Sequence, residues 1–478
     1  MKNPAENDTN EDDSMKELIC LLGIGLAAVT QAGDPVFYPV ETDQPGQWFL
    51  RSIESGRKKY EKHYLERLDK LAPAEKRAAY AADYFRMLDE LAVSNREEDA
   101  AIEKALQWKP GDFTYHNDKF YRRTGCTSWM VMPDASITGA CMVQKTRDYT
   151  GQNLLSIRLF RAMPGRYKII TVGDLWSSGA GAVMNEKGLM IVQNDGPGWE
   201  QCTRKVNTGC VFLLRYLAER CATAAEAEAE LRRLYAAGII RSADLYIIGD
   251  LNRGVVIETT AQSVASAPVD FGFEVRANTF QLPGMSSRGN AARKQEVYLI
   301  GENRRFAAGE FLGARLREKG LLSPLDLMAC SRLRDPEQEK NKWRQVCMKN
   351  TIASTLMVPD RSYPDVLSAV FISLGPTRST VYLPVPMGVT EFPEEMANGD
   401  MGLLAFAVRE KYGLDHDRLP QYNALEKELM DEFFAARDQA RILLRQSKRD
   451  EARKLLTELF RKQFLRVRAF LKQELDAK

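Results

Sequence analysis

Between Thr127 and about residue 385 the sequence alternates short strand hairpins with stretches of helical period, and this alternation restricts the fold more than any other feature. One hairpin is predicted from Val183 to Val192, where Gly188 supplies the positive φ that the turn needs, and another from Leu245 to Thr259. Between them, residues 211–238 carry a helical period that ends in a glycine suited to a C-cap. Hairpins that alternate with helices indicate an α+β layered domain and not regular βαβ units.

Helical sequence flanks this domain on both sides. From about residue 47 to 107, apolar residues recur at helical spacing and Lys and Glu fill the other face. Residues 421–478 are strongly charged and carry an apolar stripe, which predicts a helical hairpin packed on the core or on a partner subunit. The stripe consists of Leu456, Phe460, Phe464, Val467 and Leu471. We therefore expect a helical segment over 34–125, a mixed core over 126–385 and a helical extension over 386–478.

The N-terminal residues have the pattern of a leader sequence. Residues 1–14 are acidic and nearly free of apolar side chains, so we expect them to be disordered. Residues 15–33 contain an apolar run from Leu18 to Ala32, which is short for a membrane span and suits the core of a signal peptide. The acidic stretch before it has the wrong charge for a signal peptide unless translation starts at Met15. We expect a secreted or periplasmic protein, or a cytoplasmic one if this run is not a signal peptide.

Composition excludes several classes of function. The net charge is +2, from 67 basic and 65 acidic residues, so the basic excess of a nucleic-acid binder is missing. The three histidines (His63, His116 and His416) are isolated, which disfavours a histidine zinc site or a Ser/His/Asp triad. The eight cysteines form no C-x-x-C pair, and no dinucleotide or P-loop motif occurs. We expect no metal and no cofactor, and proton chemistry that does not depend on histidine.

The Gly125–Cys126 junction offers such chemistry. Gly125 has no side chain to block approach to the peptide bond, and a strand-rich region begins directly after Cys126. If this bond breaks, Cys126 acquires an α-amino group with a reference pKa of about 7.7–8.0. An amine of that pKa can accept the thiol proton near neutral pH, so one residue provides both nucleophile and base.

The segments that follow Cys126 resemble those of the penicillin acyltransferase-type autoproteolytic acyltransferases and hydrolases, which are relatives of choloylglycine hydrolases and acid ceramidases in the N-terminal-nucleophile (Ntn) hydrolase superfamily. No single motif is specific, but their ordered succession over about 126–385 is. The matching segments are Gly125–Ser128, Gln144–Tyr149, Met184–Leu189, Gln193–Asn194, Gly249–Glu258, Ala277–Phe280, Thr351–Ser354 and Gly375–Pro376.

The resemblance implies a four-layer αββα sandwich, in which two stacked antiparallel sheets lie between helical layers and Cys126 ends a strand in the cleft between the sheets. It implies self-cleavage between Gly125 and Cys126. By the same resemblance Asp148 orients the freed amine of Cys126, Asn194 donates to the oxyanion, and Asn278 is a second amide near the substrate carbonyl and amine.

Cationic positions depart from the family pattern. Lys145 stands where many relatives have arginine, and Thr146 stands where they have asparagine. Lysine keeps the charge but loses the planar fork for a bidentate contact. Arg147, next along the strand, is expected to face the other way. A cation after Asn278 is common in the relatives, and we assign Arg293 to it in preference to Arg288.

The implied function is an amidohydrolase or acyltransferase for linear, non-peptide amides, acting through an acyl-thioester on Cys126. One alternative is an Ntn cysteine dipeptidase, which Tyr382–Pro384 and Gly388–Pro393 resemble, although the long stretch before Cys126 argues against it. Another is a non-catalytic secreted protein that keeps the fold. The expected partners are a small-molecule amide or acyl substrate and the cleaved N-terminal segment. The substrate, the fate of segment 34–125, any disulfides and homo-oligomerisation stay open.

Overall fold

The fold is taken from a computed structural model, which describes most of the chain after residue 64. The described residues are 37–40, 61, 65–91, 95–119, 125–148, 155–160, 162, 164–174, 177–197, 210–240, 242–289, 295–334, 345–393, 396 and 400–477. The predictions for the acidic leader and the signal-like segment lie outside these residues. Among the helices of the described part, none is long and apolar enough to cross a membrane.

The larger of two sheets has eight strands in the order β1-β4-β5-β6-β7-β8-β9-β10. Neighbours are antiparallel, except that β1 runs parallel to β4. The strands are β1 (Phe37–Val40), β4 (Leu155–Phe160), β5 (Ile169–Asp174), β6 (Ala182–Asn185), β7 (Met190–Asp195), β8 (Asp244–Gly249), β9 (Gly254–Thr259) and β10 (Val264–Val269).

The smaller sheet has six antiparallel strands in the order β11-β2-β3-β12-β13-β14. They are β2 (Cys126–Val131), β3 (Met142–Asp148), β11 (Phe273–Arg276), β12 (Thr351–Val358), β13 (Ala369–Leu374) and β14 (Tyr382–Pro386). Both predicted hairpins are confirmed as β6–β7, with Gly188 at φ +85° in its turn, and β8–β9.

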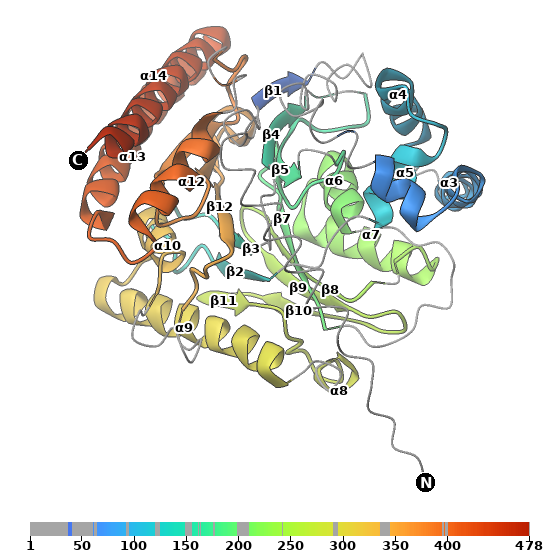
Figure 1. Cartoon of the computed structure of the whole chain (residues 1–478). Helices are drawn as coiled ribbons and strands as arrows, with labels where there is room; N and C mark the ends of the chain where they lie inside the picture. Colours follow the sequence, from blue (N-terminus) through green and yellow to red (C-terminus); the bar gives the residue numbers. More distant parts are fainter. Residues whose placement is uncertain are drawn as a thin grey trace.

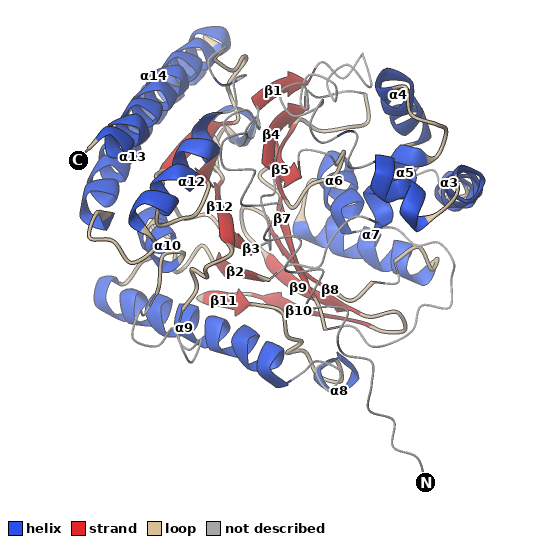
Figure 2. Ribbon diagram, viewed as in Figure 1, coloured by secondary structure: helices blue, strands red, loops and turns tan. Residues whose placement is uncertain are grey.

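The two sheets stack face to face and bury a methionine-rich core between them (Figure 2). Met130 of β2 and Val143 of β3 share this core with Met184, Met190 and Ile247 of the larger sheet. The sheets approach closely at the start of β9, where a Cβ on Gly254 would overlap the Met130 side chain. Packing at this spacing fixes which residues of β2 and β3 face the larger sheet.

Helices cover the outer face of the larger sheet. α6 (Cys210–Arg220) and α7 (Ala224–Ala236) pack directly on it, and α3 (Ala74–Asp89), α4 (Arg96–Leu106) and α5 (Asp112–Lys119) lie beyond them (Figure 1). The period over 211–238 therefore belongs to two helices. The second helix, α7, has Thr223 as its N-cap. The Thr223 side chain accepts a hydrogen bond from the Glu226 amide at 3.2 Å, as expected for the sequence Thr-x-x-Glu.

Other helices cover the smaller sheet. α9 (Gln295–Lys319) and α10 (Pro324–Cys330) pack on its outer face (Figure 1), whereas α13 (Leu419–Arg445) and α14 (Arg449–Asp476) contact edge strand β14 from its two sides. Phe433 of α13 contacts Phe371 on one side, and Phe460 and Phe464 of α14 pack on the inter-sheet side. The hairpin predicted from the 421–478 stripe is thus present and packs on the core. Further helices are α8 (Ser286–Gly289), α11 (Pro364–Leu367) and α12 (Asp400–Tyr412).

These elements form an α+β structure of helix, sheet, sheet and helix layers, in agreement with the predicted class. The segment before Cys126 differs from its prediction in one respect. It was expected to be helical, and α3, α4 and α5 are, but Phe37–Val40 forms strand β1. The reason is the free edge of β4, whose backbone groups β1 satisfies through a parallel ladder.

Candidate active site

Cys126 is the first residue of β2 and points into the space between the sheets. Successive side chains of a strand alternate between its faces. Trp129 and Val131 pack with α9 and α10, whereas Met130 lies in the inter-sheet core and Ser128 donates to Asn194 of β7 at 2.7 Å. Cys126 shares the face of Ser128 and Met130. Its side chain is therefore directed at the larger sheet, in a residue that is only 1% exposed.

The Gly125–Cys126 peptide is held on both sides. The backbone amide of Asp148 donates to the Gly125 carbonyl oxygen at 2.8 Å, and the Cys126 amide donates to Asn278 Oδ1 at 2.9 Å. A Cβ at position 125 would lie 2.9 Å from Asp148 Oδ2 and 3.0 Å from Arg304 Nη1. Only glycine fits at position 125 without displacing those two side chains.

A buried ion pair lies against Gly125. Asp148 ends β3 and pairs with Arg304 of α9, and its Oδ1 accepts from Thr351 Oγ1 at 2.5 Å. Burial raises the pKa of Asp148, while the Arg304 charge and the Thr351 hydrogen bond oppose that shift. Asp148 lies on the face of β3 opposite to Lys145 and Arg147, so it reaches the junction from the α9 side and not from the inter-sheet space.

The two predicted amides lie close to this junction, with different partners. Asn278 accepts from the Cys126 amide and donates to the Asp195 carbonyl at 2.9 Å. Asn194 accepts from Ser128, and its Nδ2 donates to the carbonyls of Arg276 at 3.2 Å and Ala277 at 3.1 Å. Both amide hydrogens of Asn194 are therefore engaged in the uncleaved chain, and one of them must be released before this side chain can donate to an oxyanion.

The turn after Asn278 is fixed by two carboxylates. Glu258 of β9 accepts from the backbone amides of Gln281 at 2.7 Å and Leu282 at 3.0 Å. Glu302 of α9 accepts from the Thr279 hydroxyl and from Gln281 Nε2 at 2.7 Å. These contacts set the position of Asn278, and through it the position of the Cys126 amide.

Two cations of β3 face the inter-sheet space. Lys145 donates to the carbonyl oxygens of Gly181, at 3.3 Å, and Gln193, and Arg147 forms an ion pair with Asp174 at 2.6 Å. The expectation that Arg147 faces away was wrong, because two positions separate it from Lys145 and strand residues two apart share a face. Thr146 points to the other side, where its hydroxyl bonds the backbone of Thr127.

The predicted downstream cations are not placed by the described residues. Arg293 lies outside them, and Arg288 belongs to α8 but its side chain is not among those described. The cation found at Asp148 is Arg304, which the sequence analysis missed. Nothing in the local sequence separates it from its neighbour Arg305. Only burial does, since Arg304 is 2% exposed, whereas the side chain of Arg305 keeps 23% of its surface exposed beside the buried Glu302.

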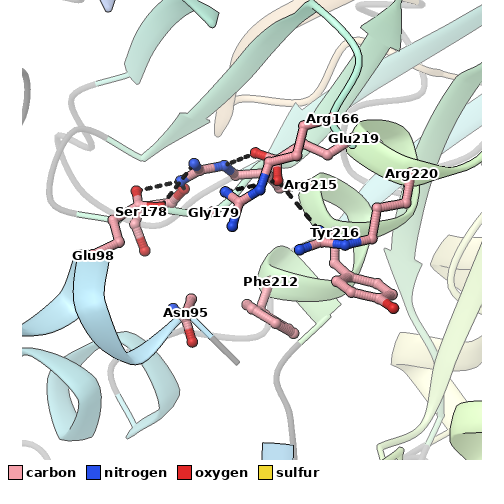
Figure 3. Close-up of a pocket in the computed structure, with 10 residues that line it drawn as sticks. All are labelled: Asn95, Glu98, Arg166, Ser178, Gly179, Phe212, Arg215, Tyr216, Glu219 and Arg220. Atoms are coloured by element: carbon pink, nitrogen blue, oxygen red, sulfur yellow. Dashed lines mark hydrogen bonds and ion pairs between the residues drawn. The ribbon is translucent and has the colours of Figure 1, made fainter. Parts of the chain in front are cut away.

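Two cavities adjoin the larger sheet, one on each of its faces. One, of about 250 Å³ to its open mouth, lies between the sheets and is lined by Lys145 and Arg147. A second, of about 340 Å³ to its mouth, lies between α4 and α6 on the outer side of the larger sheet, where Figure 3 shows Arg215 between Glu98 and Glu219. Only the inter-sheet cavity adjoins the Cys126 face. Within the described residues, no three His, Cys, Asp or Glu side chains converge as a metal site would.

The side chains of five cysteines are described, and all five are buried: Cys126, Cys141, Cys221, Cys330 and Cys347. Burial raises the pKa of Cys141, Cys221, Cys330 and Cys347. A raised pKa keeps a thiol protonated and unreactive near neutral pH. Those four thiols are therefore poor candidates for a nucleophile.

No known family model matches the chain, and no curated protein matches it. Among solved structures, a variant of conjugated bile acid hydrolase from Clostridium perfringens aligns with a TM-score of 0.36 at 11% identity, over 55% of this chain and 92% of the other. An N-acylethanolamine-hydrolyzing acid amidase ortholog from Caenorhabditis elegans gives 0.36 at 16%, over 50% and 95%. Penicillin V acylase from Agrobacterium tumefaciens gives 0.34 at 11%, over 55% and 86%. At these values we infer no activity from the likeness.

Proposed function

We propose that this protein is an Ntn-type amidohydrolase or acyltransferase that cleaves its own Gly125–Cys126 bond and then uses Cys126 as nucleophile. The observation that carries the proposal is the geometry of that peptide. Its carbonyl oxygen and its amide each have a fixed hydrogen-bond partner, Asp148 N–H and Asn278 Oδ1, and its flanking thiol points into the inter-sheet space. A peptide bond anchored on both sides next to a nucleophile is arranged for attack at a defined angle.

In the first stage, Cys126 Sγ attacks the Gly125 carbonyl carbon. The Asp148 amide, already at 2.8 Å from the carbonyl oxygen, stabilises the negative charge that develops there. The C–N bond breaks, the thiol proton passes to the Cys126 nitrogen, and a thioester joins Gly125 to Sγ. Water then hydrolyses this thioester, which gives the Gly125 carboxylate and restores the thiol beside a free α-amine.

In the second stage, the α-amine accepts the thiol proton, and Sγ attacks the carbonyl carbon of a linear amide substrate. The amide C–N bond breaks, the leaving amine takes a proton, and the acyl group remains on Sγ as a thioester. Water completes a hydrolysis, and an amine completes an acyl transfer. Asn278 holds the α-amine through Oδ1, and Asp148 with Arg304 supports it from the α9 side.

No observation favours a dipeptidase. One of the two segments that suggested it, Tyr382–Pro384, lies in β14, and β3, β12 and β13 separate it from the strand of Cys126. Its Tyr382 hydroxyl accepts a hydrogen bond from Gln144 at 2.9 Å on the face toward α9 and α10, away from the thiol. These residues hold the sheet to its helices.

Intact-mass analysis of the purified protein tests the proposal. We expect two fragments that meet between Gly125 and Cys126, and a single uncut chain for Cys126→Ala. Cys141→Ala is the matched control, because Cys141 is also a buried thiol of the inter-sheet core, and this variant should cleave as the wild type does. A folded wild-type chain that stays uncut, or cleavage that persists in Cys126→Ala, contradicts the mechanism.

A further inference from the structure

The inter-sheet cavity is built next to the strand of Cys126. Its floor is formed by β3 and β12, where Arg147 and Lys145 lie beside Ala353 and Thr355. Across the β2–β3 ladder, Arg147 is directly opposite Cys126 and Lys145 is opposite Ser128. Neighbouring strands are about 4.8 Å apart, so the floor begins one strand away from the proposed nucleophile. An acyl group attached to Sγ would therefore extend from β2 over β3 into the cavity.

The cavity has apolar walls and a cation within it. Leu155, Val172 and Ala182 of the larger sheet form its roof, and Ala353 adds to its floor. Such walls suit a hydrocarbon chain. Lys145 interrupts them with a side chain that is 4% exposed.

The ammonium of Lys145 is not neutralised by a direct ion pair within the described residues, in contrast to Arg147, which is paired with Asp174. It bonds two backbone carbonyls, of Gly181 and Gln193, at the place where the β6–β7 ladder ends. An ammonium has three donors, so one remains for another partner. Burying a cation without a counter-ion is costly, and an anionic ligand would offset that cost.

The position of Lys145 limits the length of that ligand. Lys145 is two residues along β3 from Arg147, which is opposite Cys126, and such diagonal neighbours on one face of a sheet lie about 7–8 Å apart. An acyl chain of four or five carbons spans this gap, and a long fatty acyl chain would carry its end past Lys145. A terminal carboxylate on such a chain would reach Lys145 while its amide carbonyl remained near Cys126.

The geometry points to a substrate class: short acyl groups that carry a terminal carboxylate, of succinyl to glutaryl length, with Lys145 as the residue that selects the carboxylate. This inference rests on the proposed function, because it assumes that the acyl group becomes attached to Cys126. Binding of such a carboxylate also explains why lysine occupies position 145. A compact ammonium can donate to two carbonyls and still present a donor to a carboxylate oxygen.

Chromogenic anilides test the selection. We expect the cleaved protein to hydrolyse glutaryl-p-nitroanilide with a kcat/KM about tenfold to a hundredfold above that for pentanoyl-p-nitroanilide, which has the same carbon count and no charge, since a hydrogen bond between charged groups is worth that much. In Lys145→Met this ratio should fall to about one, whatever the remaining rate. Lys168→Met is the matched control, because Lys168 also donates to a backbone carbonyl but lies outside the cavity, and its ratio should stay high.

Calorimetry separates failure of this inference from failure of the proposed function. The uncleaved Cys126→Ala chain contains the same cavity, and we expect glutaramate to bind it at least tenfold more tightly than pentanamide does. Lys145→Met should abolish this difference. If both anilides are cleaved equally, or both amides bind equally, the inference is overturned and the nucleophile is unaffected. If glutaramate binds selectively but neither anilide reacts, the carboxylate site stands and the catalytic proposal does not.

Discussion

The least replaceable residue around the junction is Gly125, and the reason lies in its neighbours. Asp148 and Arg304 form an ion pair of two almost fully buried side chains within 3.0 Å of where a Cβ would lie. Burying two charges is favourable only while both are present and well bonded. Thr351 supplies the additional hydrogen bond that such a pair needs. The pair therefore occupies the space beside Gly125 that any larger side chain would need.

Arg304→Met should lower the free energy of unfolding by about 3–5 kcal/mol, because it leaves the Asp148 carboxylate buried without its partner. It should also slow self-cleavage, since Asp148 supplies the amide bonded to Gly125. A second arginine of α9 is the control: Arg315 pairs with Glu318 in an exposed i,i+3 contact, so Arg315→Met should cost about 0.5 kcal/mol or less. Urea unfolding at constant m-value measures both.

The double variant Asp148→Asn, Arg304→Met checks the cause. If the loss in Arg304→Met comes from an unpaired charge, removing that charge should restore part of the stability. Equal losses in the Arg304 and Arg315 variants, or no recovery in the double variant, would show that the pair is not what stabilises this region.

At the scale of elements, α9 carries much of the positioning. Within four residues it contributes Gly301 against Thr279, Glu302 to the turn after Asn278, and Arg304 to Asp148. Both partners of the Gly125–Cys126 peptide are therefore set by one turn of one helix. The spacing of hydrophobic residues could not predict the role of this turn, because Glu302 and Arg304 are polar residues that face inward.

Sequence patterns could predict the elements that depend on local spacing. The β6–β7 turn follows from Gly188, the α13–α14 hairpin from its apolar stripe, and the α+β class from the alternation of both. Contacts between distant segments were beyond such patterns. Arg304 differs from Arg305 only by which side of α9 meets Asp148, and strand β1 exists only because β4 offers a free edge.

Asp99 of α4 should make the free energy of unfolding depend on pH. Asp99 is buried, and burial, followed by the nearby charge of Glu98, raises its pKa well above the ordinary value. An acid whose pKa is raised by folding binds protons more tightly in the folded state, so stability is lost as pH rises from the unfolded pKa, about 3.9, through the folded one. We expect Asp99→Asn, which keeps an acceptor for Thr114 Oγ1, to remove this part of the loss.

Hydrogen exchange of residues 96–119 as a function of pH measures this effect locally. Glu97→Gln is the control, because Glu97 is the exposed acid two positions before Asp99 on the same helix, and its removal should leave the pH dependence unchanged. A loss of protection at higher pH, measured relative to the intrinsic base-catalysed exchange rate, that is equally present in Asp99→Asn would assign the dependence to another group.

On the scale of the whole molecule, the segment before Cys126 is part of the fold. Its strand β1 extends the larger sheet, and α3, α4 and α5 share one apolar core with α6 and α7. Leu88, Ile102 and Phe113 of this segment are buried in that core. Arg215 of α6 binds Glu98 of α4 in a bidentate contact at 2.6 and 2.9 Å, as Figure 3 shows. Cutting one peptide bond leaves all these contacts in place.

We therefore propose that segment 34–125 remains bound after self-cleavage and that the mature protein is a complex of two chains. Both fragments should elute together in size exclusion and separate only in denaturant. Glu98→Gln should lower the urea concentration at which they separate, because it removes one of the two bidentate carboxylate contacts that join α4 to the buried Arg215 of α6. Glu97→Gln, one residue away and exposed, should not. Loss of the smaller fragment from the wild type without denaturant would mean that the shared core depends on the intact junction, and that the segment is a removable prosegment.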